Sequence, residues 1–313
     1  MITKFEQILE AVADYPVRTV AVAVPEKREV IEAVKAAMER SIARPLLFGS
    51  RGVIEQLAAD AGLDLGSVEV IDEPDDLEAA RQAALAVREG RADLLMKGHI
   101  YTDDFLRAVL DKETGLRAGS IMSHVFILET LERGKLTFVT DGAMNIAPDL
   151  TTKADIIMNA VYLARCFGIE CPKVGVLAAV EVVNPQMPAT LDAAALSTME
   201  ARCQFPDCVV DGPFALDNAV SPAAAELKGL RGEVAGYCDI LVTPDIESGN
   251  ILSKSFAFLA KGRVAGVLVG AAAPVVLTSR ADSAEAKLYS IATAVLMANL
   301  RRSERLKIGK VHF

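Results

Sequence analysis

The sequence predicts an α/β protein with mainly parallel strands and two domains. Short apolar runs alternate with longer stretches whose apolar residues recur at helical spacing, a pattern that is typical of βαβ units. The chain has 313 residues, which exceeds the size at which a single hydrophobic core usually stops growing. The alternation also changes once, near residues 124–139, and this break favours a boundary between two folded parts.

The first third of the chain alternates regularly. Apolar residues at helical spacing cover residues 5–12, and residues 19–24 then form an apolar run that indicates a strand. Asp75 or Asp76 can cap a helix that extends to about Gly90. Further strands are expected at residues 45–49, 68–71 and 93–97, and further helices at 30–38, 53–57 and 102–110, the last capped by Thr102.

The regular order breaks at two apolar runs, residues 124–128 and 136–139. The segment between them, residues 129–135, has room for a turn but not for a crossover helix, so the runs are expected to pair antiparallel. No linker composition separates the two parts, and the expected domains are residues 1–126 with 266–313, and residues 127–265. Alternation resumes through residues 154–167, 174–180, 193–199, 240–242, 253–260 and 268–269, then a strand at 275–277 and a terminal helix opened by Ser283.

Charge and composition exclude several classes of protein. Lys+Arg 33 against Asp+Glu 42 gives a net charge of −9 without a basic run, which disfavours a nucleic-acid partner. Gly and Pro interrupt the apolar runs, and acidic residues interrupt the N-terminal segment, so a cytoplasmic protein with no membrane partner is expected. The five cysteines fit no common zinc spacing, and buried reduced thiols are the favoured interpretation.

Residues 274–283 carry the most informative pattern. An apolar strand ends at Thr278, and Ser279 and Arg280 follow directly before the helix that Ser283 opens. In α/β proteins, ligands bind beyond the carboxyl ends of parallel strands and beside helix N-termini. A hydroxyl and a guanidinium at that place favour a phosphate or another oxyanion as the ligand.

A second candidate segment covers residues 239–254. An apolar strand ends at Thr243, a polar loop with Glu247 and Asn250 is expected to follow, and a helix is expected to begin at residue 251. Lys254 lies one helical turn beyond Asn250 and shares its face. An ordinary turn capped by Ser248 or Asn250 explains this pattern equally well.

Other polar residues follow predicted strands elsewhere. Lys97 ends a strand, Thr102 starts a helix, and Arg107 lies on the second turn of that helix, either as an anion contact or on a solvated face. Asp211 follows the apolar pair 209–210 and precedes turn residues that are typical of the rim of a cleft. The chain lacks dinucleotide-binding, Walker, serine-elbow and zinc-protease motifs.

Taken in order, these segments resemble the phosphate acetyl/butyryltransferase family, and more closely its butyryl branch. The likeness is carried by Met-Lys-Gly at 96–98 with Thr102 and Arg107, Thr-Asp-Gly-Ala-Met-Asn at 140–145, Asp-Gly-Pro-Phe-Ala-Leu-Asp-Asn at 211–218, Pro-Asp-Ile-Glu-Ser-Gly-Asn at 244–250, and Leu-Thr-Ser-Arg-Ala-Asp-Ser at 277–283. The resemblance implies two α/β/α domains of the isopropylmalate-dehydrogenase-like type, an active site in the cleft between them, and a homodimer formed through the second domain.

The resemblance also implies a reaction, in which a short-chain acyl-CoA such as butyryl-CoA or acetyl-CoA and inorganic phosphate give acyl phosphate and CoA in a ternary complex. CoA is then a substrate or product, and neither a metal nor a bound cofactor is expected. Phosphate already is an anionic nucleophile, so the protein mainly needs to position the reactants and stabilise charge. Arg280 is expected to hold phosphate, and Ser279 the carbonyl oxygen or phosphate. Further substrate contacts are expected from Lys97, Thr102, Arg107, Asp211, Glu247, Asn250 and Lys254.

One position departs from the family pattern. The acetyl branch has an aspartate at the position of Ala286, where it is thought to act as the base toward the CoA thiol. Asp282 and Glu285 are the nearby carboxylates, and their spacing favours a helix cap with its reciprocal partner. The base therefore stays open, as does the acyl chain length. The alternatives are an acyl-CoA-sensing module without activity and a dehydrogenase of the isopropylmalate or hydroxythreonine-phosphate type.

Overall fold

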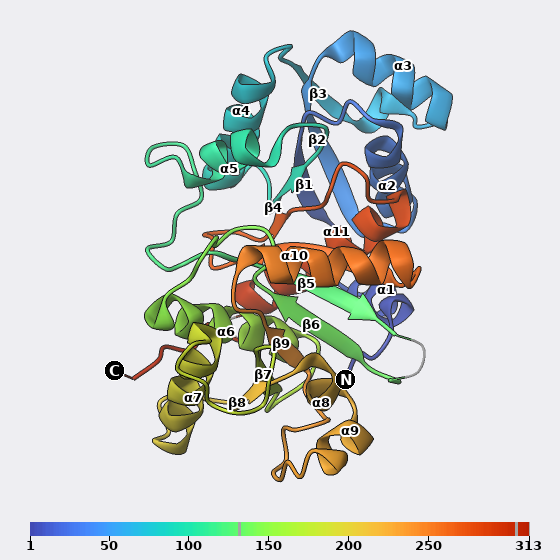
Figure 1. Ribbon diagram of the computed structural model, residues 1–313. Helices are drawn as coiled ribbons and strands as arrows, with labels where there is room; N and C mark the ends of the chain where they lie inside the picture. The colour runs from blue at the N-terminus through green and yellow to red at the C-terminus, as the bar shows by residue number, and fades with distance from the viewer. Residues whose placement is uncertain (131–132, 304–305, 313) are drawn as a thin grey trace. The chain divides into compact units, whose positions relative to one another are not determined.

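The computed structural model describes residues 1–130, 133–303 and 306–312 (Figure 1). The chain forms two compact units. The first, called here the N-terminal unit, consists of Phe5–Ser120 and Ala265–Ser303. The second, called the central unit, consists of Met1–Lys4, Ile121–Val264 and Glu304–Phe313. The predicted α/β class with two domains and mainly parallel strands is confirmed.

Strands of the N-terminal unit follow the order β3-β2-β1-β4-β11-β10. Neighbours from β3 to β11 pair parallel, and β10 pairs antiparallel with β11. The strands are β1 (Arg18–Ala23), β2 (Ala43–Gly49), β3 (Glu69–Asp72), β4 (Leu94–Lys97), β10 (Arg263–Val269, whose first residues belong to the central unit) and β11 (Val275–Val276). The helices are α1 (Phe5–Ala13), α2 (Arg28–Glu39), α3 (Arg51–Ala61), the short turn η1 (Leu65–Ser67), α4 (Asp76–Arg88), α5 (Thr102–Leu110) and α11 (Ala284–Arg302).

The strand order reverses direction between β1 and β4. The chain moves outward from β1 through β2 to β3 and then returns to place β4 on the other side of β1. Because parallel crossovers are right-handed, this reversal sends α4 to the opposite face from α2, and Figure 1 shows the two helices on opposite sides of the strands. The carboxyl ends of β1 and β4 therefore form a topological switch point, where open parallel sheets bind ligands.

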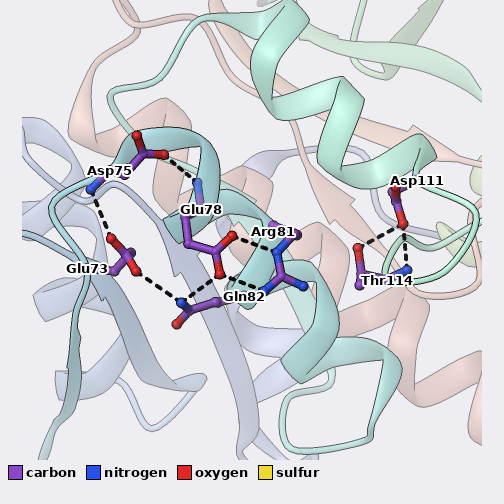
Figure 2. A network of polar contacts seen from close by, with 7 residues as sticks. All are labelled: Glu73, Asp75, Glu78, Arg81, Gln82, Asp111 and Thr114. Carbon is purple, nitrogen blue, oxygen red and sulfur yellow. Dashed lines mark hydrogen bonds and ion pairs between the residues drawn. The ribbon is translucent and has the colours of Figure 1, made fainter.

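The first turn of α4 is fixed by a connected polar network, shown in Figure 2. Asp75 caps the helix by accepting a hydrogen bond from the Glu78 N–H at 2.8 Å, so the first of the two predicted caps is confirmed. The Glu78 carboxylate accepts bonds from Arg81 at 2.7 and 2.6 Å, and these bonds lower its pKa to about 2. Gln82 bridges Glu78 and Glu73.

The end of α5 is marked by a polar turn, which also lies in Figure 2. The Asp111 carboxylate accepts hydrogen bonds from the backbone N–H and the hydroxyl of Thr114, at 2.7 and 2.9 Å. Gly115 follows, and a side chain there would meet backbone atoms at 2.5 Å. The polar turn and the close backbone contact end the helix, and the chain then continues to Ile121, where the main segment of the central unit begins.

Strands of the central unit follow the order β5-β6-β9-β7-β8. β5 and β6 pair antiparallel, as predicted, and the other neighbours pair parallel. The predicted connection at 129–135 includes residues 131 and 132, which lie outside the described residues. The strands are β5 (Ser123–Glu129), β6 (Leu136–Thr140), β7 (Lys173–Leu177), β8 (Val209–Phe214) and β9 (Ile240–Val242). The helices are α6 (Leu150–Cys166), α7 (Pro188–Ala201), α8 (Leu216–Val220), α9 (Pro222–Leu227) and α10 (Ile246–Lys254), the last followed by the π turn Ser255–Leu259.

Each unit has its own apolar core. In the N-terminal unit, α1 is held against α11 by the stacked rings of Phe5 and Tyr289, whose centroids lie 4.7 Å apart. In the central unit, Phe138 packs edge-on against Phe167, and the whole middle of α6 is buried. None of the helices in the described part of the chain is both long enough and apolar enough to cross a membrane.

Candidate functional site

The candidate site of the N-terminal unit begins at the switch point. The backbone N–H of Gly98, just beyond β4, donates to the carbonyl of Ala23 at 2.9 Å, and His99 N–H donates to Val24 at 2.6 Å. A side chain on Gly98 would lie 2.1 Å from the Val24 carbonyl oxygen, so only glycine fits this contact. The loops after β1 and β4 are thereby joined, and Lys97 is held at the end of its strand.

Lys97 is a buried cation without a polar partner. Only 1% of the residue is exposed to solvent. Its ammonium forms no hydrogen bond or ion pair with the described residues. Burial, together with the positive charges of Arg280 and Lys287, lowers the pKa of Lys97 to about 8, against an opposing effect of Asp282. A buried, unpaired ammonium beside other cations indicates a site for an anion.

The loop after β11 carries the residues that the sequence identified first. The Arg280 guanidinium lies over the ring of Tyr101, 4.1 Å from its centroid. The Ser279 N–H donates to the Asp282 carboxylate at 2.7 Å, and the Ser279 hydroxyl oxygen accepts from the Ala281 N–H at 3.3 Å. The structure therefore brings the two cations, Arg280 and Lys97, close together, with Ser279 on the same loop as Arg280. The ring of Tyr101 packs against the Arg280 guanidinium.

Two lysines that the sequence analysis did not identify donate hydrogen bonds to the backbone carbonyls of this loop. Lys287, on α11, donates to the carbonyls of Ser279 and Asp282 at 3.0 and 2.7 Å. Lys27, at the start of α2, donates to the carbonyl of Arg280 at 2.8 Å. A signal for Lys287 exists in the sequence, since it is a charged residue inside an otherwise apolar stretch of the helix.

Two predicted caps around this cluster were wrong, those assigned to Asp282 and Thr102. Ser283 opens α11, as predicted, and is its N-cap, because its hydroxyl accepts from the Ala286 N–H at 3.1 Å. Asp282 instead fixes the Ser279 turn, and Glu285 meets the Tyr289 hydroxyl at 3.4 Å. Likewise, the N-cap of α5 is Tyr101 without a side-chain bond, so Thr102 is the first helical residue and not the cap. In each case the residue one position away has the extended backbone that a cap requires.

Arg107 lies apart from the groups that surround Lys97. Its side chain is largely exposed and pairs with Asp104 on the same helix at 2.9 Å. The charge effects on Lys97 come from Arg280, Lys287 and Asp282, and Arg107 is not among them. The solvated-face alternative thus describes its arrangement in this structure, and its contact with substrate stays a prediction.

The candidate site of the central unit lies where β6 and β9 end. Gly249 packs on this edge so closely that a side chain there would be 2.5 Å from the Asp141 carbonyl oxygen and 2.7 Å from the Thr243 hydroxyl. The Asn250 amide donates to the Gly142 carbonyl at 2.9 Å. The Asp141 carboxylate in turn accepts the N–H groups of residues 143–145.

The predicted loop at residues 247–250 was wrong. Asp245 caps α10 by accepting from the Ser248 N–H at 2.8 Å, so the helix begins at Ile246 and includes Glu247 and Asn250. Glu247 and Lys254 are both exposed, and neither forms a polar contact with the described residues. Lys254 ends the helix one turn beyond Asn250, as predicted.

Asp211 lies inside a strand and not at a turn, which corrects the prediction. β8 continues through Gly212 and Pro213 to Phe214, and one oxygen of Asp211 accepts from the Ser197 hydroxyl and the Gly212 N–H, both at 2.8 Å. Proline is tolerated because β8 is the last strand of the central unit's order and the missing N–H costs no ladder bond there. Asp211 thereby joins α7 to β8.

None of the five cysteines is among the residues of either candidate site. All five cysteines are free, and burial raises the pKa of Cys166, Cys208 and Cys238 to about 12, which makes them inert. Cys171 and Cys203 are exposed, so the expectation of buried thiols was wrong for these two. Among the residues that the structure describes, no group of three or more His, Cys, Asp or Glu side chains could hold a metal ion.

Comparisons with known proteins identify the family of the chain. Residues 77–295 match the family described as phosphate acetyl/butaryl transferase. A phosphate butyryltransferase of Clostridium acetobutylicum is 48% identical over 298 residues, 95% of this chain and 99% of that protein. A phosphate acetyltransferase of Thermotoga maritima is 45% identical over 281 residues, 90% of this chain and 95% of that protein.

Solved structures extend the likeness to the fold. A branched-chain phosphotransacylase from Enterococcus faecalis V583 superposes with a TM-score of 0.79 at 33% identity, covering 90% of this chain and 99% of that one. A 4-hydroxythreonine-4-phosphate dehydrogenase from Salmonella typhimurium reaches a TM-score of 0.53 at 15% identity, over 90% of this chain and 99% of that one, which shows a shared fold alone. The family match and the extent of these similarities lead to one conclusion: the chain belongs to the phosphate acetyl/butaryl transferase family.

Proposed function

We propose that the protein transfers a short acyl group from CoA to inorganic phosphate, giving acyl phosphate and free CoA. The observation that supports this most directly is the buried, unpartnered ammonium of Lys97 beside Arg280, at the carboxyl ends of parallel strands. Such a cluster binds a compact, highly charged anion, and inorganic phosphate fits it. The names of two relatives, at 48% and 45% identity, describe the same reaction on butyryl and acetyl donors.

The reaction requires little covalent chemistry from the protein. An oxygen of hydrogen phosphate attacks the thioester carbonyl carbon, the carbon–sulfur bond breaks, and the electron pair leaves on the CoA sulfur. The proton that hydrogen phosphate gives up balances the one that the thiolate takes, so no cofactor is consumed. Arg280 and Lys97 hold the phosphate, and the Ser279 hydroxyl donates to the carbonyl oxygen as negative charge develops there.

The remaining substrate contacts are assigned to CoA. Lys254 and Asn250 offer an ammonium and an amide on one helical face, and the exposed Glu247 precedes them on the same helix. Arg107 and Thr102 contribute from α5 on the N-terminal unit. Asp211 acts indirectly, because the oxygen that it offers to Ser197 and Gly212 is already engaged.

The rival functions lack a supporting observation. A dehydrogenase of the hydroxythreonine-phosphate type shares the fold at 15% identity, and likeness at that level carries no activity. A non-catalytic sensor would have no need for the unpaired ammonium of Lys97. Acyl length stays open, because 48% identity to a butyryltransferase and 45% to an acetyltransferase do not separate the two donors.

The proposed assembly is a homodimer formed through the central unit. The support is a set of apolar side chains that the central unit leaves exposed, which includes Val182, Val183, Leu216 and Leu227. Sedimentation of the purified protein should give twice the chain mass, and replacement of Val182 and Leu227 by Ser should lower it. A single-chain mass for the unaltered protein would contradict this part of the proposal.

The decisive experiment measures release of CoA thiol from acetyl-, propionyl- and butyryl-CoA with a thiol reagent, at increasing concentrations of phosphate. Release should depend on phosphate with each donor that is used. Arg280→Ala should lower kcat/KM for phosphate roughly 10- to 100-fold, as expected for the loss of a charge-assisted contact. Arg91→Ala is the matched control, because Arg91 is exposed and pairs with Glu69 before β4 begins. No phosphate-dependent release from any donor would refute the proposal.

A further inference from the structure

The Lys287 side chain is buried without an obvious structural need. The residue is 1% exposed, although it lies in the first turn of a helix that continues for several turns. Its ammonium reaches back to the carbonyls of Ser279 and Asp282, at 3.0 and 2.7 Å. Burial lowers the pKa of Lys287, which shows that its charge is held there at a cost. A methionine of the same length would fill this space without that cost.

The contacts of Lys287 fix both ends of the loop that carries the reactive residues. Ser279 and Asp282 are also joined by two direct bonds, from the Ser279 N–H to the Asp282 carboxylate at 2.7 Å and from the Asp282 N–H to the Ser279 carbonyl at 3.2 Å. Lys27 donates to the carbonyl of Arg280 between them. The carbonyls at 279, 280 and 282 therefore all point toward ammonium groups.

This orientation determines where the backbone donors of the loop point. In a trans peptide the N–H of a residue points away from the carbonyl of the residue before it. The N–H groups of Arg280 and Ser283 therefore point away from Lys287, and neither has a hydrogen-bond partner among the described residues. Unpaired N–H groups on one side of a loop form an anion-binding concavity. The Arg280 side chain belongs to the same loop.

We propose that Lys287 is a positioning residue for phosphate: its ammonium holds the carbonyls of Ser279 and Asp282 so that the Arg280 and Ser283 N–H groups, the Ser279 hydroxyl and the Arg280 guanidinium are presented to the anion together. This inference rests on the proposed function for the identity of the anion. It assigns Lys287 no contact with substrate. The alternative is that Lys287 only joins the loop to α11, in which case its loss would reduce stability and leave the kinetic constants nearly unchanged.

The experiment compares Lys287→Met with Lys287→Arg. The methionine keeps the length of the side chain and removes its donors, whereas arginine restores charge and donors. We expect Lys287→Met to lower kcat about 100-fold and to raise KM for phosphate with little change in KM for acyl-CoA, because small displacements of reacting groups carry losses of that size. Lys287→Arg should recover at least part of the loss. Urea unfolding should show Lys287→Met to be no less stable than the unaltered protein.

Lys35→Met is the control, because the Lys35 ammonium also donates to a backbone carbonyl, that of Ala61 at 3.0 Å, and its other partner is Glu39 on the same helix, outside the candidate site. Its kinetic constants should stay unchanged. A folded Lys287→Met protein with kcat and phosphate KM within about threefold of normal would overturn the inference. So would equal losses for phosphate and acyl-CoA with no recovery in Lys287→Arg.

A second measurement does not depend on any variant. Phosphate should slow amide hydrogen exchange in the peptide that covers residues 279–283 of the unaltered protein, because it binds the free N–H groups of Arg280 and Ser283. Unchanged exchange at saturating phosphate would overturn the inference even if Lys287→Met fails to fold. If phosphate protects this peptide but no acyl-CoA is cleaved, the proposed function fails and the loop inference stands.

Discussion

Replacement of Lys97 by methionine should stabilise the protein while it abolishes efficient use of phosphate. Lys97 is buried at the end of β4, and no carboxylate among the described residues pairs with it. Methionine is unbranched and of similar length, so it can occupy the same space without a charge. The substitution therefore removes an uncompensated charge from the interior and leaves the packing nearly intact.

The magnitude follows from the pKa. A fall in the pKa of Lys97 from 10.5 to about 8 corresponds to about 3 kcal/mol, since a tenfold change in proton affinity is worth about 1.4 kcal/mol. The charged form is disfavoured in the folded state, so this cost is fully present below pH 8. Between pH 8 and pH 10.5 the folded lysine is neutral while the unfolded one still binds its proton. Stability of the unaltered protein relative to Lys97→Met should therefore rise across that interval.

Urea unfolding at pH 7 and at pH 10 measures this difference. At pH 7 Lys97→Met should exceed the unaltered protein by up to about 3 kcal/mol in unfolding free energy, and at pH 10 the gap should nearly close. Lys153→Met is the control with the opposite sign. Lys153 is also buried, but its ammonium pairs with the Asp192 carboxylate at 2.6 Å. Its replacement leaves that carboxylate without its partner and should lower the unfolding free energy.

The effect of phosphate on stability tests the functional part of the same prediction. At a concentration of about 100 Kd, phosphate should stabilise the unaltered protein by about 2.7 kcal/mol and Lys97→Met by much less. The reasoning is refuted if Lys97→Met is less stable than the unaltered protein at pH 7, or if phosphate stabilises both equally. The first result would show that the ammonium has a favourable partner, and the second that the anion binds elsewhere.

Further predictions concern groups around both sites. Tyr101→Leu should raise KM for phosphate roughly two- to fivefold, because an exposed cation–π contact with Arg280 is worth about 0.5–1 kcal/mol; steady-state kinetics would show no change if the ring is incidental. Ser283→Ala should lower the unfolding free energy by about 1 kcal/mol through loss of the α11 cap, and an unchanged urea midpoint would contradict that role. Gly249→Ala should reduce the yield of folded protein, since its side chain would lie 2.5 Å from the Asp141 carbonyl oxygen; normal yield and turnover would count against the close contact.

The sequence predicts most strands of this fold well, because most are compact apolar runs with a clear stop; β8 is an exception, since it continues through Asp211 to Phe214. The expected strand at residues 240–242 coincides with β9, and the expected pairing of residues 124–128 with 136–139 is the antiparallel pair β5 and β6. The Ser279-Arg280 loop was identified for the same reason, since it is the polar stop after a buried strand. These signals are local, and the fold preserves them.

Helix starts were predicted less well, because several neighbouring residues compete to cap them. At α10 the predicted cap was Ser248 or Asn250, but the cap is Asp245, because it has the extended backbone directly before the helix. At α11 Ser283 wins over Asp282, whose carboxylate is engaged by the Ser279 N–H. The choice depends on contacts that form only after the loop has folded.

The contacts of Tyr101 and Lys287 could not be predicted from sequence patterns. Tyr101 follows β4 and meets Arg280, far away in the sequence, only because β4 and β11 are neighbours in the sheet. Lys287 lies close in sequence to Ser279 and Asp282, but its contact with their carbonyls depends on how the loop folds back along the first turn of α11. The sequence shows that the tyrosine and the lysine are present, but not which groups they contact in the folded protein.

The residues that depart from ordinary helix and strand patterns are the ones to which the two proposals assign a role. A parallel strand buried on both faces normally contains apolar residues, yet β4 ends in Lys97, and a helix core normally excludes charge, yet α11 buries Lys287. Burial disfavours the charge of each ammonium, and Lys97 is also repelled by Arg280 and Lys287. Under the proposed function, phosphate beside Lys97 and Arg280 would offset this repulsion, so part of its binding free energy would come from relief of a destabilisation in the free protein. The same argument explains why a more stable variant at position 97 should be a poorer enzyme.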